Sequence, residues 1–157
     1  MTPEGGVTAG GRRHSRGQAG RRRRGRELAL RVLFELEGTE RDAGTSLRYH
    51  AADLGAAPDV ADFAGRLVTG TLEHAAAVDS AIDGASVNWR LRDIGKVERA
   101  ILRLGAYELL FEPGVPVAAA IDEAIELTRT YAGDEASPFV NGVLGRIARG
   151  DEGGGEE

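Results

Sequence analysis

Apolar residues recur at helical spacing along most of the chain. The longest stripe covers six turns from Val60 to Ile82 and is preceded by Pro58 and Asp59, which suit a helix start. Shorter stripes predict helices over about 21–37, 45–54, 96–111, 116–133 and 137–147, with one further turn near 90–94. No alternating stretch is long enough for a strand. The pattern therefore predicts an all-α bundle of six or seven helices.

Local signals refine these elements. Thr45 or Ser46 is suited to cap the helix at 45–54, and Ser137 is suited to cap the last helix, with Pro138 at its first position. The helix at 96–111 is apolar on both faces, which predicts a place in the middle of the bundle.

The two ends of the chain differ from its centre. Residues 1–20 are mostly glycine, arginine, alanine and threonine and cannot bury apolar surface, so they predict a disordered basic extension. Residues 150–157 predict a disordered acidic tail, which leaves 21–149 as the folded domain. The chain has no cysteine, no apolar run of about 20 residues and no apolar stretch after its basic start. We therefore expect a cytoplasmic protein.

Charge is unevenly distributed. Residues 1–26 carry a net +7 from eight arginines and one glutamate, which leaves −12 for the rest of a chain whose net charge is −5. Arginine suits phosphate oxygens, and five of these arginines lie at the start of the first predicted helix, where they oppose its dipole. A solubilising tail is the simpler explanation of a charge run. The acidic body beside the run favours a nucleic acid instead.

The remaining polar residues give little sign of catalysis. Two carboxylate pairs at helical spacing and three scattered histidines are best explained as solvated helix faces: Asp79 with Asp83, Asp122 with Glu126, and His14, His50 and His74. Phosphate-loop, dinucleotide, zinc-protease and serine-hydrolase motifs are absent from the sequence. Trp89 lies in a predicted loop, where packing over the bundle end is the simpler role. Phe139 is suited either to core packing or to stacking on an unpaired base, and composition favours packing.

Three segments together resemble a known family. Residues 22–34 (RRRGRELALRVLF), residues 95–109 (GKVERAILRLGAYEL), and the run of VP at 115–116, AIDEAIEL at 120–127 and FVNGVL at 139–144 resemble transcription antitermination proteins of the NusB family. The resemblance covers about residues 21–149.

Membership would imply an all-helical fold of two packed subdomains with no catalytic activity, no cofactor and no metal. It would also imply binding of single-stranded boxA RNA from ribosomal RNA leaders, as a heterodimer with the ribosomal protein NusE. That complex acts with RNA polymerase and the other Nus factors to suppress premature termination. Some members pair with themselves through the RNA-binding surface, so a homodimer also remains open.

The resemblance assigns roles to individual residues. Contact with RNA falls on the arginine-rich motif, on the phenylalanine of FVNG and on the acidic residue before it: Arg21, Arg22, Arg23, Arg24, Arg26, Phe139 and Glu135. Glu98 falls in the region that faces NusE. Two departures are visible, since Val117 replaces a frequent aromatic residue and the loop at 133–137 is one residue short.

Two other functions compete with this one. A related helical domain precedes some ribosomal RNA cytosine methyltransferases, but that chemistry needs a cofactor-binding α/β domain and a cysteine nucleophile, and this sequence has neither. A structural adaptor that uses only the acidic body would retain its function without residues 1–26. The arginines make an RNA-binding factor the leading hypothesis.

Overall fold

The computed structural model describes the backbone of residues 3–150 and the side chains of residues 17–150. Within this part, seven α-helices and two 3₁₀ turns follow one another without a strand: α1 Pro3–Leu36, α2 Ala43–Leu54, α3 Pro58–Glu73, α4 Ala75–Ala85, η1 Leu91–Asp93, α5 Lys96–Phe111, α6 Val117–Tyr131, η2 Asp134–Ala136 and α7 Ser137–Arg149. The predicted all-α fold is confirmed.

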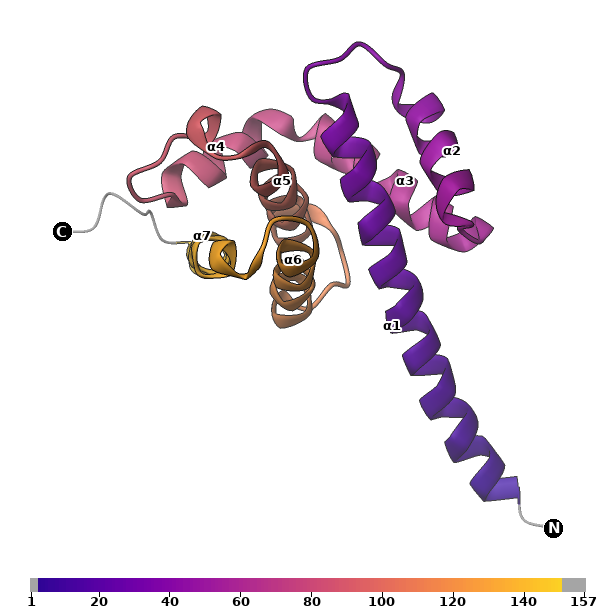
Figure 1. The fold of residues 1–157 in the computed structure, drawn as a ribbon. Coiled ribbons are helices and arrows are strands. Elements are labelled where there is room, and N and C mark those ends of the chain that lie inside the picture. The colour runs from indigo at the N-terminus through magenta and orange to yellow at the C-terminus, as the bar shows by residue number, and fades with distance from the viewer. Residues whose placement is uncertain (1–2, 151–157) are drawn as a thin grey trace.

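The helices form two packed groups (Figure 1). Helices α1, α2 and α3 pack against one another, and α4, α6 and α7 surround α5. Because α5 also contacts α1 and α3, it joins the two groups. Its residues Leu102 and Leu104 are fully or almost fully buried. The predicted central place of this helix is confirmed, and so are its bounds.

The longest apolar stripe belongs to two helices. The chain leaves helical geometry at His74 (φ −106°, ψ 23°), so α3 ends at Glu73 and α4 begins at Ala75. A ring nitrogen of His74 lies 2.9 Å from the carbonyl oxygen of Gly70, the group that also accepts the His74 backbone N–H. The single helix suggested by the stripe is therefore wrong. Val78 and Ile82 continue the stripe in α4 because they pack into the same core as α3.

Two predicted caps are also wrong. Asp42 caps α2, because its carboxylate accepts the backbone N–H of Thr45 at 3.0 Å. Helix α7 starts directly from η2, so Ser137 lies inside the helix and its hydroxyl is buried without a hydrogen-bond partner.

The structure also differs from the sequence-based expectation at the N-terminus. Helix α1 begins at Pro3, where the composition of residues 1–20 predicted disorder, and its first half projects from the bundle (Figure 1). Residues 21–36 already hold helical geometry, so each earlier residue extends an existing helix without a new nucleus. The predicted acidic tail beyond Gly150 lies outside the described residues.

None of the helices in the described part of the chain has the length and apolar character needed to cross a bilayer.

Candidate nucleic-acid interface

The arginine run lies on α1, and the helix points its members in different directions. Successive side chains are about 100° apart, so only Arg21 and Arg24 share a face among the first four. Arg24 is exposed and has no hydrogen-bond or ion-pair partner among the described residues. Arg21 lies 3.0 Å from the exposed Asp59, and both Nε and Nη2 of Arg23 donate to Glu123. The exposed pair of Arg21 with Asp59 is weak and can exchange for a phosphate, whereas the two-bond pair of Arg23 holds a partly covered carboxylate.

Arg22 points toward α3. Its guanidinium lies 5.7 Å from the ring centre of Phe63, and Arg66 lies 5.2 Å from the same ring. These side chains, with Arg21 and Asp59, line a hollow of about 210 Å³. Arg66 therefore belongs with Arg21 to Arg24 to one region of the surface, the arginine end. The sequence analysis missed it. Arg66 follows Phe63 by three positions, a spacing that places both on one face of α3, and this spacing could have revealed it.

Arg26 is placed elsewhere than the resemblance implies. It is 4% exposed, and its Nε and Nη2 donate to the buried carboxylate of Glu108 at 2.8–3.0 Å. Burial raises the pKa of the Glu108 carboxyl above its ordinary value, and the guanidinium of Arg26 opposes this shift. Arg26 therefore holds α1 against α5 and is not available to RNA. Its spacing from Ala29 and Leu33 continues the apolar stripe of α1 and could have revealed this.

Phe139 lies at the other end of α5. It is half-buried against the core and lines a hollow of about 260 Å³ together with Trp89, Gly95 and Glu98. The ring is therefore neither sealed in the interior nor fully exposed. Glu98 lines the same hollow, so the residue assigned to NusE and the residue assigned to RNA lie close together.

The other predicted contact residues are at the surface. Glu135 is exposed on η2, directly before Ala136, which lines the hollow of Phe139. Val117 is 50% exposed at the start of α6 and contributes to neither hollow.

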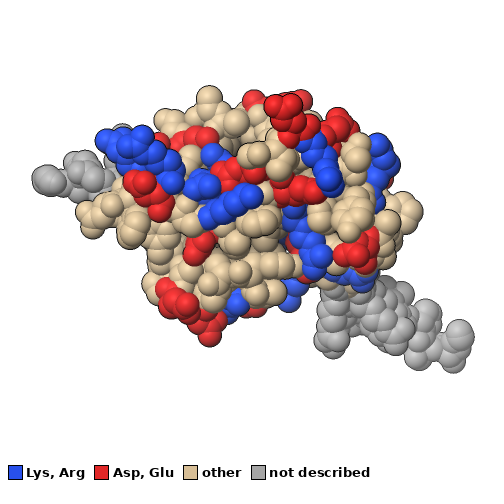
Figure 2. Space-filling model, turned by 45° about the horizontal axis from the view of Figure 1, so that its top comes forward, with Lys and Arg blue, Asp and Glu red and all other residues tan. Residues whose placement is uncertain are grey.

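The arginine end and the Phe139 hollow are not one site. Helices α1 and α5 run in opposite directions, because Arg26 meets Glu108 and Glu37 meets Arg99. Glu98 and Glu108 lie ten positions apart in α5, which corresponds to about 15 Å along the helix. Figure 2 shows basic and acidic side chains interspersed on one face instead of gathered in one large patch.

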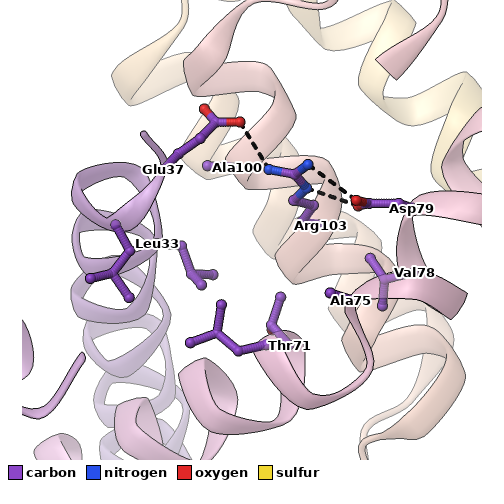
Figure 3. Close-up of a pocket in the computed structure, with 10 residues that line it drawn as sticks. Leu33, Glu37, Thr71, Ala75, Val78, Asp79, Ala100 and Arg103 are labelled. Atoms are coloured by element: carbon purple, nitrogen blue, oxygen red, sulfur yellow. Dashed lines mark hydrogen bonds and ion pairs between the residues drawn. The ribbon is translucent and has the colours of Figure 1, made fainter. Parts of the chain in front are cut away.

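An ion-pair network joins the two helix groups between these ends. Arg103 donates to Asp79 at 2.8 Å and to Glu37 at 3.0 Å (Figure 3). The guanidinium of Arg99 contributes most to holding the pKa of the Glu37 carboxyl below its ordinary value. Asp83 accepts the backbone N–H of Leu91 at 2.8 Å. The pair Asp79 and Asp83 is therefore structural, where the sequence suggested a solvated face.

The described side chains contain no group of three residues suited to hold a metal ion. The fold and the two ends together define the class: an all-α protein of two packed helical groups with an arginine-rich first helix. The chain belongs to the NusB family, whose family model, described as "NusB family", matches residues 23–149.

Known relatives agree with this membership. The transcription antitermination protein NusB of Sorangium cellulosum is 44% identical over 129 residues, which cover 82% of this chain and 92% of the relative. NusB of Pelotomaculum thermopropionicum is 39% identical, with 83% and 91% covered.

Among solved structures, T. maritima NusB superposes with a TM-score of 0.76 at 34% identity, covering 83% of this chain and 92% of that one. A complex described as antitermination factors NusB and NusE with dsRNA superposes with a TM-score of 0.76 at 27% identity, covering 83% and 97%.

Proposed function

We propose that this protein is a noncatalytic transcription antitermination factor of the cytoplasm. It binds the single-stranded boxA element of ribosomal RNA leaders together with NusE and supports processive elongation by RNA polymerase with the other Nus factors. The single observation that carries the proposal is the set of exposed arginines Arg21, Arg23 and Arg24 on α1 in a chain of the NusB family, with Arg24 unpaired among the described residues. The neighbouring structure that contains NusE and RNA supports both partners.

The two ends would contribute differently. Arg21, Arg23 and Arg24 would hold the RNA backbone, which gives affinity but little base discrimination. Phe139 in the distant hollow, with Glu135 on the adjoining turn, would supply base contact, and Glu98 beside Phe139 would face NusE. A boxA-like RNA should therefore bind the complex with NusE more tightly than a scrambled RNA at about 0.15 M salt. Equal binding of the two RNAs would contradict this function.

The arginine end is tested by Arg21→Ala combined with Arg24→Ala, which share one face of α1. Each phosphate contact on a single strand contributes about 0.7 to the slope of log affinity against log salt, so the slope should fall by about 1.4. The measurement is a salt series of RNA-binding titrations with NusE present. Arg48→Ala combined with Arg129→Ala removes the same charge from exposed positions outside both hollows. A similar fall in this control would show that only net charge matters.

Phe139→Leu tests base contact in the hollow. Leucine keeps most of the apolar volume, so the free energy of unfolding should change by less than about 1.5 kcal/mol. Loss of the ring should weaken boxA binding about tenfold, which lies within the range for one stacked base. Phe111→Leu is the matched control, because Phe111 is an exposed ring stacked on His74 at the opposite end of α5. Unchanged RNA affinity in Phe139→Leu would remove Phe139 from the interface.

A further inference from the structure

The loop between α4 and α5 separates two hollows of different chemistry. Trp89 and Asp93 line the hollow of Phe139, whereas Arg90 and Arg92 line a second hollow of about 450 Å³. Asn88, at φ 73°, adopts the left-handed conformation and turns the chain immediately before Trp89. The loop thus presents an aromatic ring to one side and two arginines to the other.

The Phe139 hollow has the features of a site for a flat ring with hydrogen-bond donors on its edge. Trp89 is 54% exposed and borders the hollow together with Phe139. The carboxylates of Asp93 and Glu98 have no hydrogen-bond or ion-pair partner among the described residues. The Glu98 carboxylate lies against Gly95 so closely that a Cβ there would collide with it. A cavity of about 150 Å³ already holds a benzene ring, so about 260 Å³ accommodates a base.

The charges exclude a phosphate from this hollow. Two carboxylates repel an anion, whereas they accept hydrogen bonds from the exocyclic amino group of a base. Uracil lacks that group. The site therefore favours an unpaired base that bears an amino group over uracil.

The second hollow is basic on balance, because four arginines line it beside the two carboxylates of Glu37 and Asp83. Arg99 and Arg103 are occupied by ion pairs with Glu37, but Arg90 and Arg92 are exposed and have no partner among the described residues. Two free guanidiniums beside a loop suit phosphate oxygens. A strand that crosses the loop would place its backbone here and its base in the first hollow.

We propose that this loop is a further RNA contact, in which one amino-bearing base lies between Trp89 and Phe139 while Arg90 and Arg92 hold the flanking phosphates. The proposal rests on the proposed function, because it takes single-stranded RNA as the ligand. It adds an aromatic contact and a phosphate contact that are separate from the exposed arginines of α1.

Trp89 is the only tryptophan of the chain, so its fluorescence reports on this hollow alone. The complex with NusE is titrated with dye-labelled boxA-like RNA, and dye anisotropy and tryptophan fluorescence are followed together. A NusE tryptophan, if present, is replaced by phenylalanine first. Binding should quench Trp89. Trp89→Ala should weaken binding about tenfold, whereas Trp89→Phe should retain most of it because the ring can still stack. Arg90→Ala with Arg92→Ala should lower the salt slope by about 1.4.

The outcomes separate the two proposals. RNA binding by anisotropy with unchanged Trp89 fluorescence and full affinity in Trp89→Ala would overturn this contact and leave the proposed function standing. Absence of any boxA preference, with or without NusE, would overturn the proposed function itself. An RNA series that replaces one base at a time by uracil should contain one position where affinity falls in wild type and much less in Trp89→Ala. A series without such a position would overturn the base preference.

Discussion

Replacing Arg26 with alanine should lower the free energy of unfolding by about 3–5 kcal/mol, the usual cost of leaving a buried charge without its partner. The carboxylate of Glu108 is buried and accepts three hydrogen bonds from Arg26. Once the guanidinium is removed, the buried Glu108 must either stay charged without a partner or take up a proton. Urea unfolding followed by circular dichroism measures the loss.

A double replacement separates the buried charge from the packing of the side chains. Arg26→Met combined with Glu108→Leu removes both charges and keeps similar volume, so its stability should return to about that of the wild type. Arg24→Ala, two residues away and exposed, should change stability by less than about 0.5 kcal/mol. An Arg26→Ala protein as stable as Arg24→Ala would show that the pair does not hold α1 to α5.

The second large loss of folding stability is expected from a substitution at Gly70 of α3. Its backbone packs directly against the ring of Tyr107, and a Cβ would overlap the ring carbons and the hydroxyl oxygen. The ring has little freedom to move, because Tyr107 is 6% exposed and its hydroxyl donates to Glu112 at 2.9 Å. Gly70→Ala should therefore lower the free energy of unfolding by about 2 kcal/mol, as overpacking of a filled core does. Thermal and urea unfolding measure it.

Replacement of a glycine by alanine in α4, at Gly84, serves as the control. A Cβ at Gly84 would meet no atom within 4 Å, so only the better helix propensity of alanine acts there. Gly84→Ala should raise the free energy of unfolding by about 0.5–1 kcal/mol. Changes of the same sign at both glycines would contradict the close packing of Tyr107 on α3.

Much of the fold could be predicted because apolar spacing reports burial directly. The bounds of α5 were clear, since apolar residues on both faces continue to Phe111 and Pro113 follows. The break at His74 was hidden, because the apolar stripe continues through it and no glycine or proline marks it. The start of α7 was hidden for a related reason: η2 leads directly into it, so Ser137 never occupies the capping position.

The site was less accessible to prediction because it depends on pairs that are distant in sequence. A run of arginines reads as uniform, yet burial of Arg26 depends on Glu108, 82 residues later. Trp89 and Phe139 are 50 positions apart, and only the packing of α7 beside the start of α5 brings them to one hollow. Periodicity shows which side of a helix faces inward, but it does not show which residues of other helices that side contacts.

The junction at His74 helps to fix the distance between the arginine end and the Phe139 hollow. Because α3 passes into α4 through one residue, and Arg103 ties both groups together, the chain has no linker there about which the halves could swing. The separation between the arginine end and the aromatic hollow is then set by the protein scaffold alone. An RNA that made both of the proposed contacts would have to match that distance, and the protein would then select RNA by the spacing of its contacted elements as well as by their sequence.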